Sequence, residues 1–230
     1  MEYSVKHIAI IPDGNRRWAR NLGKSPLEGH KVAVEKTLPA LYDEMLRLKV
    51  PYCTFWAMSP ENFKKRSETE INNLLFLIGV FLQKRLKELH EKNIKILTIG
   101  DIAHLPKDTQ KQIQTAQETT KDNTGLVFTI AINYGGRDEM VRSIQKIIES
   151  NTEVTEVTPE LISQTLDTRA LPDPDLIIRT GGEKRTSGFL LWQSDYAEYA
   201  FVDTLFPDFT PEMLVACIEE FEHRQRRFGK

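Results

Sequence analysis

Residues 8–18, which read IAIIPDGNRRW, decide the fold of this chain. An unbroken apolar run of this kind is typical of a strand buried on both faces, as strands of parallel sheets are. The run ends in a carboxylate, a glycine, an asparagine and two arginines. In open α/β sheets, ligands bind beyond the carboxyl ends of the strands. Asp13, Gly14 and Asn15 are therefore predicted to lie at a binding edge.

Apolar runs and amphipathic stretches alternate along the rest of the chain. Strands are predicted at residues 7–11, 52–57, 94–99, 127–132, 176–179 and 199–202. Helices are predicted at residues 30–48, 68–92, 107–121 and 136–150, in a short segment from Thr158, and from Thr210 to near Arg226. The alternation predicts one α/β domain over residues 1–230, with a central, mainly parallel sheet flanked by helices. Pro39 predicts a kink in the first long helix.

The composition excludes some classes of protein. Lys and Arg number 31 against 33 Asp and Glu, so the net charge of -2 gives no general attraction to nucleic acid. Cys53 and Cys217 stand in apolar surroundings without C-x-x-C spacing, which favours reduced thiols and a cytoplasmic location. We expect no signal peptide and no membrane span, because no apolar stretch approaches about 20 residues.

Glycine and arginine also follow other predicted strands. Asn133–Arg137 reads NYGGR, and residues 179–187 read RTGGEKRTS. Glycine lets a ligand approach the backbone, and arginine binds phosphate oxygens in pairs. Neither G-x-x-x-x-G-K-[ST] nor G-x-G-x-x-G occurs, so a diphosphate without a nucleotide is the favoured ligand.

Each of these features also has an ordinary structural interpretation. Asp13 and Asn15 can cap a helix, and His30 can be a common helix-start residue. The run at residues 64–66 can be a solvated charged face, and Trp18 can belong to the core. Asp13 can pair with the arginines, or it can hold Mg²⁺ together with phosphate oxygens. Glu198 is a second candidate acid.

The chain resembles the cis-prenyltransferase family, which includes undecaprenyl diphosphate synthase. The resemblance rests on HIAIIPDGNRRWAR with a later GH pair, FWAMSPENFKKRS, INYGGRDE and the long block that begins DPDLIIRTGGEKRTSGFLLWQSDYAEYAF, and it covers residues 7–229. It implies a homodimer with a six-stranded α/β fold. It also implies Mg²⁺-dependent condensation of isopentenyl diphosphate with an allylic diphosphate, such as farnesyl or geranyl diphosphate. The product would be a Z-polyprenyl diphosphate, a carrier lipid for cell-wall or glycan synthesis such as undecaprenyl diphosphate.

The resemblance also implies roles for individual residues. Asp13 is the essential acid and, with Glu198, the metal-binding pair; Asn62 and His30 complete the catalytic set. The residues implied in substrate binding are Gly14, Asn15, Arg16, Arg17, Trp18, His30, Ser59, Asn62, Phe63, Arg66, Arg179, Arg185, Ser187, Arg227 and Gly229. Arg227 and Gly229 belong to a C-terminal R-x-G motif that reaches the partner subunit's active site in this family.

The chain departs from the family pattern at a few positions. Pro26 and its neighbours stand where the family often has an arginine, and Arg16 replaces a commoner glycine. Lys65 and Arg66 compete for one basic role, for which Arg66 is favoured. The proton acceptor stays open between Asp13, His30 and a diphosphate oxygen.

The alternative functions are a non-catalytic accessory subunit and a nucleic-acid-binding protein. Peripheral membrane association for product release is compatible with the sequence.

Overall fold

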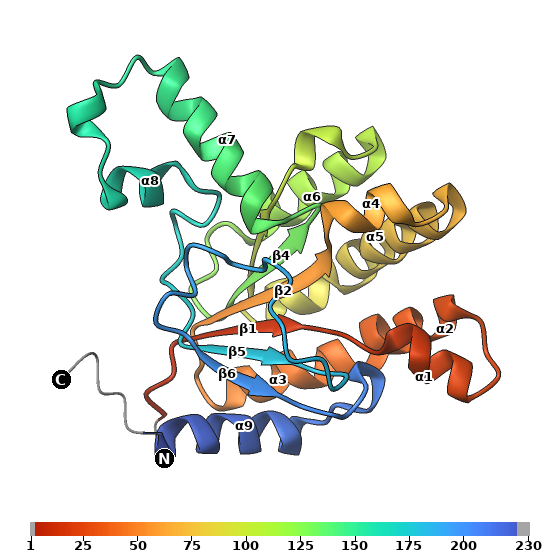
Figure 1. The fold of residues 1–230 in the computed structure, drawn as a ribbon. Helices are drawn as coiled ribbons and strands as arrows, with labels where there is room; N and C mark the ends of the chain where they lie inside the picture. The colour runs from red at the N-terminus through yellow and green to blue at the C-terminus, as the bar shows by residue number, and fades with distance from the viewer. Residues whose placement is uncertain (1–2, 225–230) are drawn as a thin grey trace.

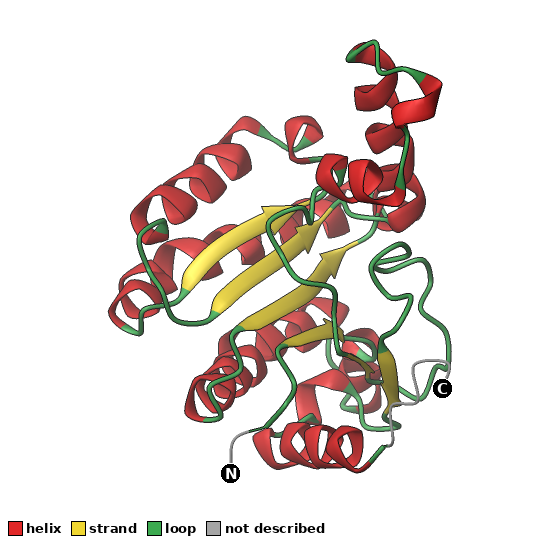
Figure 2. Ribbon diagram, turned by 90° about the vertical axis from the view of Figure 1, so that its left-hand side faces the viewer, coloured by secondary structure: helices red, strands yellow, loops and turns green. Residues whose placement is uncertain are grey.

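The computed structural model describes residues 3–224 and contains a six-stranded, wholly parallel sheet in the order β3-β4-β2-β1-β5-β6. Figure 2 shows the strand arrows running the same way. The strands are β1 (His7–Ile11), β2 (Tyr52–Met58), β3 (Lys95–Ile99), β4 (Val127–Ile132), β5 (Leu176–Arg179) and β6 (Glu198–Phe201). The predicted α/β architecture is therefore confirmed, and three strands have the predicted bounds.

Helices occupy most of the connections between the strands (Figure 1). The α-helices are α1 (Asn15–Asn21), α2 (Pro26–Val32), α3 (Leu38–Arg47), α4 (Pro60–Lys65), α5 (Glu68–Glu91), α6 (Lys107–Thr120), α7 (Gly136–Glu149), α8 (Pro159–Thr165) and α9 (Pro211–His223). Short 3₁₀ turns lie at Ile102–His104, Val154–Glu156 and Phe206–Asp208. The short helices α1 and α4 were not predicted, because each has only two turns and little apolar periodicity.

The predicted kink near Pro39 takes the form of a π-helical segment, Ala33–Thr37, between α2 and α3. Proline has no N–H to donate and its ring clashes with the carbonyl four residues earlier, here that of Glu35. A wider turn relieves that clash. The Arg85 guanidinium of α5 donates to the Glu35 carbonyl at 2.8 Å, so this carbonyl still has a partner.

The core is divided unequally between the two faces of the sheet. On one face, Ile8, Ile10 and Phe128 pack in a large cluster with side chains of α3, α5 and α9. On the other face, Ala9, Ile11 and the Phe189 side chain belong to a much smaller cluster. Alternate residues of β1 therefore point into different clusters, and all five are buried, as predicted for a central parallel strand.

A helix that spans a membrane needs about 20 predominantly apolar residues. None within residues 3–224 combines the length and the apolar character needed to cross a bilayer. Even α5, with 24 residues, carries charged side chains in its first turn and again from Lys84 to Glu91.

Candidate active site

Asp13 and Arg179 meet at the carboxyl edge of the sheet. Their strands β1 and β5 are neighbours, with Ile11 opposite Arg179. The Arg179 side chain is buried, and its Nη2 donates to Asp13 Oδ2 at 2.8 Å. Arg17 Nη2 lies 3.6 Å from the other carboxylate oxygen. Two guanidinium groups therefore hold the Asp13 carboxylate, which remains about one-third exposed.

The backbone around Asp13 is fixed by the loops that follow β5 and β6. The Asp13 carbonyl accepts hydrogen bonds from Thr180 Oγ1 at 2.8 Å and from the Phe206 backbone N–H at 3.0 Å. Gly14 has a φ of 107°, and a Cβ added there would lie 2.8 Å from Leu205 Cδ2. Both the left-handed backbone and this close approach require glycine at position 14.

Arg179 also organises the loop after its own strand. Its Nη1 donates to the Arg185 carbonyl at 2.5 Å and to Ser187 Oγ at 3.0 Å. Arg17 Nη2 donates to the Gly181 carbonyl at 2.6 Å. The sequence-predicted residues Asp13, Arg17, Arg179 and Ser187 are thus joined in one hydrogen-bonded unit, with Arg185 bound through its backbone.

A cavity of about 680 Å³ begins at this unit. Its polar part is lined by Asp13, Asn15, Arg16, His30, Ser59, Glu61, Asn62, Lys65, Arg66, Arg179, Arg185 and Ser187. The same cavity continues along an apolar wall made of Ala33, Val34, Leu38, Phe55, Leu74, Leu77, Ile78, Phe81, Phe128 and Ile130. One continuous space therefore joins a strongly cationic end to a long hydrocarbon-like end.

A second cavity of about 350 Å³ lies beside the first, around the start of α1. It is lined by Pro12, Asp13, Gly14, Asn15, Arg16, Arg17, Arg20, His30 and Arg66. Four arginines against a single carboxylate make this lining suited to a polyanion such as a diphosphate. Arg20 was missed in the sequence, although its i+3 and i+4 spacing from Arg17 and Arg16 on α1 is a signal that can find it.

His30 lines both cavities. Burial, together with the positive charges of Arg66 and Arg16, lowers its pKa to about 4. The imidazole is therefore neutral near pH 7. His30 Nε2, Asn15 Oδ1 and Arg179 Nε are buried polar atoms that have no hydrogen-bond partner within residues 3–224. Three such atoms around one cavity indicate a site for a polar ligand group.

Ser59 and Asn62 form a capping box at the start of α4. Ser59 Oγ accepts from the Asn62 N–H, and Asn62 Oδ1 accepts from the Ser59 N–H, both at 3.3 Å. Ser59 and Asn62 therefore cap α4, and both residues also line the larger cavity. Lys65 and Arg66 both line that cavity, and Arg66 lines the second one as well.

Several predicted site residues are not brought to the cavities within one chain. Trp18 donates to Asp208 Oδ1 at 2.7 Å, and Phe63 packs against the large core cluster. Glu198 begins β6, opposite Leu176 at the amino end of β5, and its carboxylate accepts from Arg224 at 2.9 Å. The pair of Asp13 and Glu198 is therefore not formed within a chain. Arg227 and Gly229 lie outside the described residues.

The carboxylates near the cavities decide whether this site can hold a divalent cation. Within residues 3–224, no three His, Cys, Asp or Glu side chains form a cluster that could hold a metal ion. Asp13 at the end of β1 lines both cavities, and Glu61 of α4 is a second carboxylate residue lining the larger one. This donor set fits Mg²⁺ when phosphate oxygens complete the coordination, because Mg²⁺ in such sites takes one or two carboxylates plus substrate phosphates.

Together, the cavities define a class of protein that handles amphiphiles with a diphosphate-sized anionic head and a long apolar tail. Comparison with known proteins agrees with this class. The family model described as "Putative undecaprenyl diphosphate synthase" matches residues 11–229. The isoprenyl transferase of Clostridium perfringens is 43% identical over 228 residues, covering 97% of this chain and 89% of that relative. The chain belongs to the undecaprenyl diphosphate synthase family and is a prenyl transferase.

One further relative and two solved structures are also similar to this chain. The Micrococcus luteus ditrans,polycis-undecaprenyl-diphosphate synthase, described as (2E,6E)-farnesyl-diphosphate specific, is 43% identical over 228 residues, covering 97% of this chain and 91% of the relative. Among solved structures, lavandulyl diphosphate synthase from Lavandula x intermedia, in complex with dimethylallyl diphosphate, superposes with a TM-score of 0.94 at 34% identity. A probable undecaprenyl diphosphate synthase from Campylobacter jejuni gives a TM-score of 0.83 at 34% identity. Both alignments cover 99% of each chain.

Proposed function

We propose that this chain is a cis-prenyltransferase that condenses isopentenyl diphosphate with an allylic diphosphate to give a Z-polyprenyl diphosphate such as undecaprenyl diphosphate. One observation carries the proposal: the 680 Å³ cavity joins the arginine-lined edge to an apolar wall. The Micrococcus luteus relative named for farnesyl diphosphate specificity supports an allylic primer of that kind. The lavandulyl diphosphate synthase structure, which holds dimethylallyl diphosphate, supports an allylic diphosphate site in this fold.

The allylic diphosphate is assigned to the cavity around the start of α1. In the reaction, the bond between the allylic carbon and the diphosphate oxygen breaks, and negative charge accumulates on the leaving diphosphate. Arg16 and Arg17 line this cavity, so they stabilise that charge more in the transition state than in the ground state. Arg66 lines it as well and holds the diphosphate about equally in both states. Neutral His30 donates a hydrogen bond to the same group.

Isopentenyl diphosphate is assigned to the loop after β5. Arg179 Nε is buried without a protein partner, while its other nitrogens fix the backbone of Arg185 and the Ser187 hydroxyl. The preorganised loop holds this second diphosphate so that the alkene faces the allylic carbon. Holding two reactants in this way contributes up to several kcal/mol to lowering the barrier. A new carbon–carbon bond forms, and a proton leaves the isopentenyl unit.

The proton acceptor is assigned to a diphosphate oxygen. His30, with a pKa of about 4, is a weak base at neutral pH. The Asp13 carboxylate faces Arg179 and Arg17, so both of its oxygens are already in contact with cations. Asp13 instead orients Arg179 and, with diphosphate oxygens, holds Mg²⁺, which offsets phosphate charge when bound.

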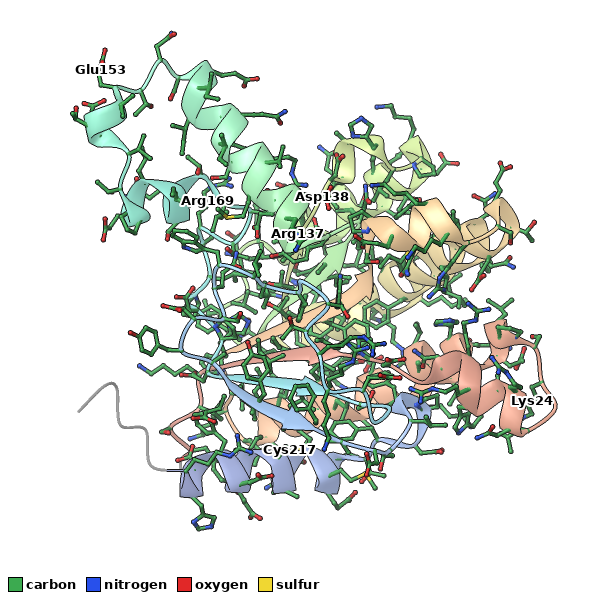
Figure 3. The ribbon with its side chains drawn as sticks, in the orientation of Figure 1. Lys24, Arg137, Asp138, Glu153, Arg169 and Cys217 are labelled. Atoms are coloured by element: carbon green, nitrogen blue, oxygen red, sulfur yellow. The ribbon has the colours of Figure 1, made fainter. Side chains whose placement is uncertain are left out.

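A homodimer belongs to the same proposal. Helix α7 buries Glu139 and Ser143 and turns an apolar stripe outward, with Val141, Ile144 and Ile148 about half exposed or more. Figure 3 shows Arg137 and Asp138 where α7 begins and Glu153 at the outer tip of the α7–α8 projection. An outward apolar stripe of this kind marks a protein interface, and a second copy offers the same stripe in return.

The accessory-subunit alternative is weaker, because a non-catalytic subunit has no need of the bonded unit around Asp13 and Arg179.

The cytoplasmic location is supported by Cys53 and Cys217, which are both buried unpaired thiols. The apolar product supports transient contact with a membrane surface during release.

The test is a product assay with purified protein, isopentenyl diphosphate, Mg²⁺ and either geranyl or farnesyl diphosphate, followed by mass spectrometry of the extracted lipids. We expect a ladder of five-carbon additions that ends at one dominant length. A folded protein that makes no product from either primer would contradict the proposed reaction and favour an accessory role.

A further inference from the structure

The sequence Ser67-Glu68-Thr69-Glu70 matches the capping-box pattern at the start of α5. The structure forms one half of this box, because Ser67 Oγ accepts from the Glu70 N–H at 3.3 Å. In a complete box, the Glu70 carboxylate would accept from the Ser67 backbone N–H. Here that carboxylate points to two arginines instead.

Glu70 Oε1 lies 3.0 Å from Arg66 Nη1 and 3.7 Å from Arg16 Nη1. The Arg66 side chain is only 17% exposed and that of Glu70 is 25% exposed. Arg16 belongs to α1, so this single carboxylate links α1 to the segment between α4 and α5. Arg16 and Arg66 both line the 350 Å³ cavity, whereas Glu70 does not.

The contact is different from an ordinary pair on one helical turn. Arg66 ends α4 with an extended backbone, at φ -94° and ψ 155°, so it does not share a continuous helix with Glu70. Burial lowers the pKa of Arg66, and the Glu70 carboxylate acts in the opposite direction. A largely buried guanidinium needs a counter-charge, and Glu70 supplies it in the absence of an anion.

We propose that Glu70 is an exchangeable counter-ion of the allylic diphosphate site. It pairs with Arg66 and Arg16 until a diphosphate takes over both guanidinium groups. The released carboxylate then completes the capping box on the Ser67 N–H, so that neither the carboxylate nor the start of α5 loses a partner. This inference rests on the proposed function, since it assumes that the cavity receives a diphosphate.

The exchange has a consequence for each turnover. Glu70 competes with the allylic diphosphate on entry and with inorganic pyrophosphate after the bond has broken. A carboxylate with two alternative partners therefore lowers the affinity for both anions and speeds the departure of pyrophosphate. Removing its charge strengthens anion binding at the cost of slower release.

The test is calorimetric titration of inorganic pyrophosphate into the full chain, with EDTA present and at fixed ionic strength. Glu70→Gln keeps the capping function but removes the charge. Glu68→Gln is the matched control, because Glu68 is an exposed acid in the same first turn and lines neither cavity. We expect Glu70→Gln to bind pyrophosphate about three- to ten-fold more tightly, as expected for loss of a partly exposed pair. Glu68→Gln should match the parent chain.

A kinetic readout separates this role from a merely structural one. Glu70→Gln should lower the KM for the allylic diphosphate by a similar factor and leave the KM for isopentenyl diphosphate unchanged. Pyrophosphate binding by Glu70→Gln that is equal to or weaker than that of Glu68→Gln would overturn the inference. A parent chain that binds no pyrophosphate would overturn the anion site as well. Tighter binding in a chain that makes no product would uphold the exchange and refute only the proposed reaction.

Discussion

Arg179 and Arg66 line the same cavity but are held in different ways. Arg179 ends a central strand, and its side chain bonds to the Asp13 carboxylate, the Arg185 carbonyl and Ser187 Oγ. Arg66 lies between α4 and α5, and its side chain pairs with Glu70 in the first turn of α5. The strand-end half of the site is therefore built before substrate arrives. In the half formed by α4 and α5, Arg66 is paired with Glu70, and a substrate diphosphate can replace this carboxylate.

This comparison separates two tasks in one site. Residues fixed by the sheet set the geometry of the reacting groups, which tolerates little displacement. Residues 59–70 contain an extended junction at Arg66 and Ser67, between α4 and α5. This junction lets the segment adjust to each incoming diphosphate. Substitutions in the first half should reduce kcat, and substitutions in the second half should mainly change KM.

The largest effect is expected for Asp13→Asn. The amide keeps the size of the side chain but loses the charge that orients Arg179 and Arg17 and that the proposed reaction needs for Mg²⁺. We expect kcat to fall by at least about 10²–10³-fold. Asp122→Asn, at an exposed position outside both cavities, is the control in the same incorporation assay. A kcat for Asp13→Asn close to that of the control would refute the central role of Asp13.

Arg179→Gln should have the next largest effect. Glutamine cannot bond to Asp13, the Arg185 carbonyl and Ser187 together, so the loop after β5 loses its anchor. We expect kcat to fall by about 10²-fold and the free energy of unfolding to fall by about 1–3 kcal/mol. Steady-state kinetics and urea unfolding measure the two effects. An intact kcat with reduced stability would show that Arg179 is only structural.

Arg66→Gln should have a smaller and different effect. Loss of one charge-assisted phosphate contact should raise the KM for the allylic diphosphate about ten-fold, with kcat changed less than three-fold. Lys64→Gln is the control, since Lys64 is exposed on α4 and lines neither cavity. A large fall in kcat with an unchanged KM would remove the distinction between the two halves.

The smallest expected effect concerns stability and pH. His30 has a pKa of about 4 in the folded chain, below its ordinary value of 6.5. Between pH 6.5 and 4 the unfolded chain therefore binds more protons, so stability falls as the pH falls. His30→Gln should reduce this slope by up to about 1.4 kcal/mol per pH unit. His7 has a similarly lowered pKa, so part of the slope should persist.

Urea unfolding at several pH values measures this slope. His104→Gln, at a mostly exposed histidine that lines neither cavity, is the control variant. A slope for His30→Gln that equals that of the parent chain would indicate that the pKa of His30 is the same in the folded and unfolded chains.

Much of the fold could be predicted because its strands are buried on both faces. The apolar run at residues 7–11 gives β1 with its observed bounds, and Asp13 follows at the expected edge. Helices α1 and α4 could not be predicted, because their first residues carry site and capping side chains instead of an apolar stripe. The α7 stripe was predicted correctly as helical, but periodicity does not tell whether a stripe faces the core or another chain.

The site was predicted in part for a similar reason. Arg179 and Asp13 follow neighbouring strands, and strand ends can be read from the sequence. Glu198 is the first residue of β6, so it lies at the amino end of the strands. Asp13 and Arg179 lie at the carboxyl ends, and closeness to an apolar run in the sequence does not tell the two ends apart. The sequence around Glu70 matches a capping box. Only the structure shows that its carboxylate pairs with Arg16 and Arg66.

Hydrogen exchange measured by mass spectrometry, with and without inorganic pyrophosphate, tests the distinction between the halves most directly. The account predicts that pyrophosphate increases protection in residues 59–70, where the junction adjusts to the anion. Backbone amides of residues 8–13 and 176–181 should change little, because their hydrogen bonds already exist. Protection that rises at the strand ends, while residues 59–70 stay unchanged, would contradict the account.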